Sequence, residues 1–355
     1  MKITVPTIDF GTSKIVTMVA QSNGERCDIV GSGAVPYSGY LQDGWNNPDE
    51  IRDVIRTAID QAQKTGNCRI HELNVGVPGM FTRVIVKEVH VSLTGPDPHV
   101  TAQDVRACFK LAEESGGDRI IHSAPAWFRV DDGKKTLSPV GIKGRELSAM
   151  IALVTADKYF IDDITYRLRD MDIEPREFYS TVAGEATYAL SQDERDKTAM
   201  LIDIGYLCTD VMVMEGDALI FHKCLDIGGG HISADIAEQL NIPFPFVEEK
   251  IKQTYSFNST NQDETYVIPA TEDEPARTVR RDEVTPIIEA KVEEIAEAIN
   301  KALEEGGVKL GKWSNVYLTG GGLILNKGGK DFLAGKLHRI IREAQRTNNK
   351  MTSHV

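Results

Sequence analysis

A repeated hairpin constrains the fold of this chain more than any other feature of its sequence. Residues 8–19 resemble residues 202–213, because in both runs an apolar strand reaches Asp-x-Gly, turns, and leaves as a strand rich in β-branched residues. This pattern is typical of a β-hairpin. The same elements follow each copy in the same order: a third strand (28–35 and 218–225), a helix (48–64 and 232–240), and a buried strand that ends in glycine (73–79 and 314–322).

A duplicated β-β-β-α-β unit predicts a two-lobed α/β protein with a ligand-binding cleft between the lobes. Each half carries its own insertion. The first covers residues 81–160, with a strand (83–91), a helix that begins at Thr101, and short strands through 128–130 and 150–155. The second begins near residue 241 and contains a polar, exposed hairpin (258–282) followed by a long helix (284–305) with an apolar stripe.

Composition and sequence patterns argue against several classes of protein. The formal net charge of −13 argues against a general nucleic-acid binder, which needs a basic surface. The sequence contains neither an apolar run of the ~18 residues that cross a bilayer nor a secretory leader, so we expect a cytoplasmic protein. The five cysteines are scattered without Cys-x-x-Cys spacing, so they predict small buried side chains instead of a disulfide framework or a zinc site.

The two hairpins carry the residues that a nucleotide polyphosphate requires. The first supplies a carboxylate, a glycine for the turn, two hydroxyls and a cation, and the second supplies the matching carboxylate and glycine: Asp9, Gly11, Thr12, Ser13, Lys14, Asp203 and Gly205. Backbone donors of a glycine turn bind phosphate oxygens, and carboxylates bind Mg²⁺ or its waters. We therefore expect the hairpins to hold the phosphates between them, with Asp9 and Asp203 as the metal-side ligands.

Three further segments are candidates for the same ligand. The glycines of 228–231 precede a helix, where unpaired N–H groups bind an anion, although a plain strand-to-helix loop is an equal alternative. Residues 319–322 end an apolar strand with glycines against which adenine can lie. Glu249 and Lys252 are three apart on an expected helix over 246–255, so they share one face, as a ligand pair or as an ordinary surface ion pair.

These motifs together resemble the actin-type ATPase superfamily and, within it, the FtsA family of bacterial cell-division proteins. The 81–160 insertion resembles the subdomain IC of that family. The resemblance implies a duplicated actin/ribonuclease-H-like fold in which residues 1–80 and 161–190 form subdomain IA, 81–160 IC, 191–240 and 306–355 IIA, and 241–305 IIB. It also implies Mg²⁺ and ATP at the hairpin residues, with the ribose and adenine contacted by Gly229, Gly230, Glu249, Lys252, Gly321 and Gly322.

By the same resemblance, we expect head-to-tail filaments, binding of the C-terminal tail peptide of the tubulin-like protein FtsZ, and recruitment of FtsZ to the membrane. The family ends in an amphipathic membrane helix, which this sequence does not show before Val355. Its last residues instead predict a helix (330–337), a core strand (339–344) and a frayed tail (346–355). The insertion interrupts the repeat without phosphate motifs, so we expect it to be an interaction module.

Two departures from the family pattern bear on activity. Tyr206 and Leu207 stand where the family has glycines, which weakens backbone donation to a phosphate. Hydrolysing relatives place a glutamate or glutamine before a proline in the stretch that corresponds to residues 178–181, and none occurs there. We therefore expect that no such residue stands near Tyr179 to position water, and that ATP hydrolysis is slow at most. Two alternatives remain open: a pilus-assembly adaptor of the same superfamily that binds an inner-membrane protein peptide, and a small-molecule kinase on the same fold.

Overall fold

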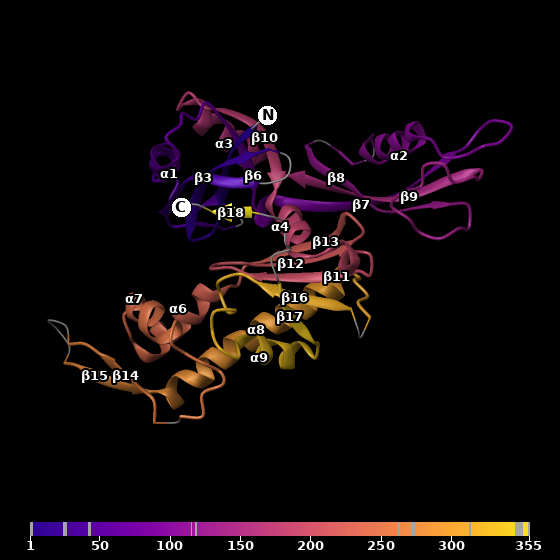
Figure 1. Cartoon of the computed structure of the whole chain (residues 1–355). Coiled ribbons are helices and arrows are strands. Elements are labelled where there is room, and N and C mark those ends of the chain that lie inside the picture. Colours follow the sequence, from indigo (N-terminus) through magenta and orange to yellow (C-terminus); the bar gives the residue numbers. More distant parts are fainter. Residues whose placement is uncertain are drawn as a thin grey trace. The chain divides into compact units, whose positions relative to one another are not determined.

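The computed structural model describes residues 3–23, 27–41, 44–114, 116–117, 119–261, 263–270, 275–311, 314–344 and 351–353. The chain forms two compact units (Figure 1). The first contains residues 1–199, 212–223 and 345–355, and the second contains residues 200–211 and 224–344. Among the described residues, every helix is too short or too polar to span a membrane.

A six-stranded sheet forms the centre of the first unit. Its strands in spatial order are β10 (Glu174–Ser180), β6 (Glu72–Val77), β1 (Ile3–Phe10), β2 (Lys14–Ser22), β3 (Cys27–Pro36) and β18 (Met351–Ser353). The predicted hairpin is β1–β2, paired antiparallel from Ile3 and Ser22 to Phe10 and Ile15. Helix α1 (Ile51–Gly66) buries an apolar face that includes Ile55 and Ile59 against this sheet, and α3 (Lys158–Arg169) adds Phe160 and Ile164 to the same core. The remaining elements here are β4 (Tyr40–Leu41), β5 (Gly44–Trp45), α4 (Thr181–Ala189) and α5 (Gln192–Arg195).

Within the first unit, the insertion forms a separate sheet with a helix packed on it. Three strands pair antiparallel in the order β7 (Thr82–Ser92), β9 (Glu146–Ala156) and β8 (Ile120–Val130), after a short 3-10 turn at Gly79–Phe81. Helix α2 (Ala102–Glu114) lies along this sheet (Figure 1) and buries Cys108 and Ala112 against Leu147 and Ile151. The insertion therefore has an apolar core of its own.

The second large sheet repeats the strand order of the first, which confirms the predicted duplication. Its five strands run β13 (Ala218–Leu225), β12 (Thr209–Glu215), β11 (Ala199–Ile204), β16 (Asn315–Thr319) and β17 (Ile341–Glu343). Read from the other edge, β16, β11, β12 and β13 correspond to β6, β1, β2 and β3. Because four strands recur in the same sequence order and the same spatial order, both halves share one topology.

The second unit also contains helices and a short hairpin. These elements are α6 (Gly229–Leu240), α7 (Phe244–Phe246), the π-helix η2 (Val247–Lys252), β14 (Thr265–Ile268), β15 (Arg277–Arg280), α8 (Arg281–Glu305) and α9 (Gly329–Leu337). The apolar stripe of α8 is buried as expected, and β14 and β15 form the predicted hairpin within the polar segment.

Two expectations about local structure were wrong. The helix expected over 246–255 is a short α-turn followed by η2, which ends at Lys252. The tail is not frayed at 351–353, since β18 pairs parallel with β3 there; residues 346–350 and 354–355 lie outside the described part of the chain. The last core strand was predicted correctly: β17 pairs with β16.

Candidate functional site

The turn of the first hairpin is fixed by one hydrogen bond within the turn and one from a residue outside it. The N–H of Gly11 donates to the carbonyl of Lys14 (3.1 Å), which fixes the four-residue turn that carries Thr12 and Ser13. The hydroxyl of Tyr37 donates to the carbonyl of Gly11 (2.8 Å). Thr12 is buried, whereas the side chain of Lys14 is exposed. The turn is thus preorganised, with its cation directed to solvent.

The carboxyl group of Asp9 lies at the end of β1, in a low-dielectric setting. Burial raises its pKa, and the N–H of Phe10 opposes that shift by donating to it. On the neighbouring strand β6, a Cβ atom on Gly76 would come within 3.3 Å of the Asp9 Oδ1 atom. A divalent cation would stabilise this buried negative charge.

The second hairpin repeats the geometry of the first. The N–H of Gly205 donates to the carbonyl of Cys208 (2.9 Å), as Gly11 does to Lys14. The carboxylate of Asp203 lies against Gly320, which has a φ of +90°, and a Cβ atom there would be 2.1 Å from Asp203 Oδ1. Only glycine fits at position 320, so the loop after β16 is shaped around this carboxylate.

The backbone donors around the second hairpin are already used within the unit. Four glycine amides at the start of α6 and after β16 donate internally: Gly228 to His231 Nδ1 (3.1 Å), Gly229 to Gly205 O (2.9 Å), Gly230 to Tyr206 O (2.7 Å) and Gly322 to Ile204 O (2.7 Å). The expectation of unpaired N–H groups for an anion at 228–231 was therefore wrong. These glycines instead allow three backbone segments to approach one another closely.

The ring of Tyr206 packs against the first turn of α6. A Cβ atom on Gly230 would lie 3.0–3.1 Å from its ring atoms, and the ammonium of Lys252 lies 5.9 Å from its ring centroid. Burial raises the pKa of the Tyr206 hydroxyl, with a smaller contribution from Glu248. The residue that replaces a family glycine thus sits among the candidate nucleotide contacts.

The acidic partner of Lys252 is not the predicted one. Lys252 is buried and donates to Glu248 Oε1 (3.1 Å), whereas Glu249 is exposed. The expected i,i+3 face was wrong because the segment is a π-helix, in which the side chains are displaced relative to an α-helix. The other carboxylate oxygen of Glu248 is buried and has no hydrogen-bond partner among the described residues.

Open space lies beside one glycine of the loop after β16. A Cβ atom on Gly321 would meet nothing within 4 Å, unlike those on Gly320 and Gly322. The amides of Gly228–Gly230 donate within the unit, so they do not hold a nucleotide in this arrangement.

The stretch around Tyr179 does contain a glutamate in contact. The Tyr179 hydroxyl donates to the carboxylate of Glu177, and this bond is the main cause of the raised pKa of the tyrosine. The premise that no glutamate stands near Tyr179 was wrong. Both side chains are exposed, however, so the pair lacks the desolvated setting that raises the basicity of a catalytic carboxylate.

A cleft of about 560 Å³ lies where the insertion meets the rest of the first unit. Its lining includes Trp127, Leu137 and Glu215. The ammonium of Lys135 lies 4.8 Å from the Trp127 ring centroid and 2.8 Å from Glu215 Oε1. The lining therefore combines a few apolar side chains with an ion pair.

Sequence reasoning missed a cluster that joins the second hairpin to β13. Cys208, Asp210 and Cys224 bring their ligand atoms within 4.8 Å of one another. Cys108 and Cys208 are buried as expected, but Cys27, Cys68 and Cys224 are only half-buried. The signal available was the Cys-x-Asp spacing, which places two side chains on one face of a strand.

Comparison with known proteins gives two family matches. The model described as "Cell division protein FtsA" matches residues 200–322, and that of the "SHS2 domain inserted in FTSA" matches residues 79–155. FtsA of Pseudomonas aeruginosa is 26% identical over 320 residues, covering 88% of this chain and 76% of the relative. FtsA of Bacillus subtilis is 26% identical over 306 residues, covering 85% and 70%.

Solved structures agree on the fold. The PilM-PilN type IV pilus biogenesis complex superposes with a TM-score of 0.63 at 17% identity, covering 97% of this chain and 89% of that one. MreB 5 of Spiroplasma citri bound to AMPPNP superposes with a TM-score of 0.55 at 11% identity, covering 96% and 91%. The chain therefore has the two-lobed actin-like α/β fold with an SHS2 insertion, and it belongs to the FtsA family of cell-division proteins.

Proposed function

We propose that this chain is an ATP-binding scaffold of bacterial cell division, which assembles into filaments and links the C-terminal tail of FtsZ to the cytoplasmic face of the membrane. Membership of the FtsA family supports the division role. The observation that carries the nucleotide part is the matched pair of turns, Gly11–Lys14 and Gly205–Cys208, each closed by the same hydrogen bond after a carboxylate. In this proposal, Asp9 and Asp203 hold Mg²⁺.

We assign the remaining nucleotide contacts by chemistry. Thr12, Ser13 and Lys14 supply hydroxyl and ammonium donors for the phosphates. One buried oxygen of Glu248 has no hydrogen-bond partner in the described part of the chain, and it accepts a hydrogen bond from a ribose hydroxyl while Lys252 fixes this carboxylate. Adenine lies beside Gly321, where a Cβ atom would otherwise project into open space. Gly205, Gly229, Gly230 and Gly322 contribute by close backbone packing, and Glu249 is not part of this assignment.

The nucleotide assignment is tested by titration calorimetry of Mg-ATP into the full chain. We expect D9A and D203A each to weaken magnesium-dependent binding by about 1–3 kcal/mol, because each removes a charge-assisted contact. E248Q and G321A should also weaken it, whereas E238Q on the exposed side of α6 should not. Unchanged affinity in both aspartate variants would refute the assignment.

The scaffold assignment is tested separately from nucleotide binding. With ATP, we expect the chain to pellet as filaments visible by electron microscopy and to bind an FtsZ tail peptide. An L137D change in the insertion cleft should impair assembly and leave ATP affinity unchanged, because none of the residues that line the cleft belongs to the phosphate motifs. Loss of ATP binding by folded L137D protein would contradict this division of roles.

Two outcomes would redirect the assignment. Binding of a peptide from an inner-membrane pilus protein in place of the FtsZ tail would favour the adaptor alternative, for which the likeness to PilM supports only the fold. Turnover above about 1 s⁻¹ on a small phosphoryl acceptor would favour a kinase. We expect slow hydrolysis instead, because the carboxylate near Tyr179 is solvent-exposed.

A further inference from the structure

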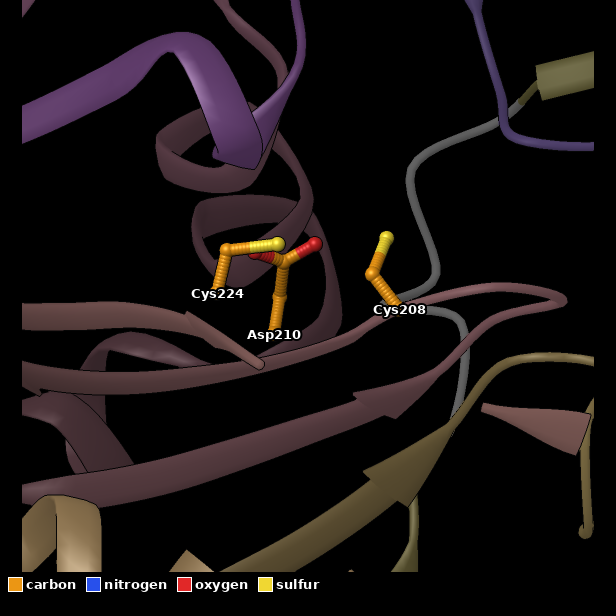
Figure 2. A group of neighbouring side chains, drawn as sticks. All are labelled: Cys208, Asp210 and Cys224. Carbon is orange, nitrogen blue, oxygen red and sulfur yellow. The ribbon is translucent and has the colours of Figure 1, made fainter. Parts of the chain in front are cut away.

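Three side chains with metal-binding atoms meet near the turn of the second hairpin. The Sγ atoms of Cys208 and Cys224 and a carboxylate oxygen of Asp210 all lie within 4.8 Å of one another. Figure 2 shows the three side chains on the same side of the strands, with the sulfur of Cys224 beside the carboxylate of Asp210. None of these contacts is used in the nucleotide assignment.

The backbone that carries these side chains is fixed by hydrogen bonds. Cys208 closes the hairpin turn by accepting from Gly205 (2.9 Å), and Asp210 is two residues further on, on the same face of the chain. Between them, the buried hydroxyl of Thr209 donates to the carbonyl of Ile227 (2.7 Å), which ties the start of β12 to the segment after β13. Cys224 lies near the end of β13, the neighbour of β12 in the sheet.

The separation of the ligand atoms suits a tetrahedral ion. With Zn–S bonds of about 2.3 Å, the sulfurs in a tetrahedral zinc site lie about 3.7 Å apart. The present atoms are within 4.8 Å of one another, so rotamer adjustments of about 1 Å complete the geometry. Two thiolates and one carboxylate form a donor set that favours Zn²⁺ over Mg²⁺ or Ca²⁺, which prefer oxygen ligands alone.

We propose that Cys208, Asp210 and Cys224 bind one Zn²⁺ ion, with a water molecule or an external ligand in the fourth position. On binding, the two S–H bonds break and their protons go to solvent, while two Zn–S bonds and one Zn–O bond form. No atom is oxidised or reduced. The ion would join the turn of the second hairpin to the end of β13.

The three groups lie close together when no cation is present. A divalent cation would supply the positive charge that stabilises both thiolates and the carboxylate together.

The test is a metal titration of the reduced full chain without nucleotide. Co²⁺ should bind at one ion per chain with thiolate-to-cobalt charge-transfer absorption and the ligand-field bands of a tetrahedral site, and Zn²⁺ should displace it. C208S and C224S should each weaken Zn²⁺ binding by roughly 100-fold or more, since loss of outer-shell partners alone costs 10–100-fold. D210N should weaken it less, and C68S, which alters a half-buried thiol elsewhere, should match the unmodified chain.

The absorption spectrum of the unmodified chain with Co²⁺ tests the proposed site even if a variant fails to fold. Absence of the charge-transfer band, or its persistence in the folded C208S/C224S double variant, would overturn the proposal. A Cys208–Cys224 disulfide formed on mild oxidation, in a chain that binds no Zn²⁺ when reduced, would also overturn it in favour of a redox pair. Because ATP is absent, this result does not depend on the nucleotide assignment.

Discussion

Replacing Gly229 with alanine tests the close approach of backbone segments in the second unit. A Cβ atom at this position would lie 2.4 Å from the Cα atom of Gly322 and 2.6 Å from its carbonyl oxygen. Both atoms belong to the backbone, so no side-chain rotation can relieve the overlap. The loops must move apart, which strains the bonds from Gly229 to Gly205 and from Gly322 to Ile204.

The expected cost follows from these contacts. Overpacking a closed site costs about 1–3 kcal/mol, and weakening two hydrogen bonds adds about 0.5–1.5 kcal/mol each. Alanine recovers up to about 1 kcal/mol through its higher helix propensity at the start of α6. We therefore expect the free energy of unfolding of G229A to fall by about 1–6 kcal/mol.

Urea denaturation followed by circular dichroism measures this loss. G321A is the matched control, because it adds the same methyl group to the partner loop where nothing lies within 4 Å. We expect G321A to change the unfolding free energy by less than about 0.5 kcal/mol. A G229A value within error of G321A would refute the inferred packing of the two glycine loops.

Three further predictions concern other parts of the chain. R195A should lower the unfolding free energy by about 3 kcal/mol or more, measured by urea denaturation, because this buried guanidinium donates to the carbonyls of Thr187, Leu190 and Gly216. Burial, aided by Asp104, raises the pKa of the Cys108 thiol from 9.0 to about 11. The unfolded chain therefore loses this proton first, and stability should fall by about 2–3 kcal/mol between pH 9 and 11, a fall that C108A removes. N326A should lower the melting temperature of the second unit in a calorimetric scan, because the buried amide donates to the carbonyls of Lys252 and Tyr255; an unchanged melting temperature would contradict this.

Much of the fold could be predicted because its signals are local and repeated. The alternation of β1 and β2, the Asp-x-Gly turns and the apolar stripe of α8 each specify one element without long-range information. Repetition then gave the order of strands, since two copies of one unit must bury the same faces.

The details of the candidate site depend on contacts that sequence periodicity does not encode. Glu248 replaces Glu249 as the partner of Lys252 because η2 is a π-helix, a state without a clear sequence signal. The amides of Gly229 and Gly230 are used internally because segments distant in sequence approach them. The thiol of Cys224 joins Cys208 only through the pairing of β12 with β13.

The glycine loops of the second unit also bear on how the chain folds. Ordering consecutive glycines costs more conformational entropy than ordering other residues, and the backbone of Gly229 meets that of Gly322 only after the long intervening segment has closed into a loop. Contacts between such distant segments form slowly and are rarely the first to appear. The hairpin of β11 and β12 can assemble early from local contacts, whereas its junction with the two glycine loops should be among the last parts of the unit to become ordered.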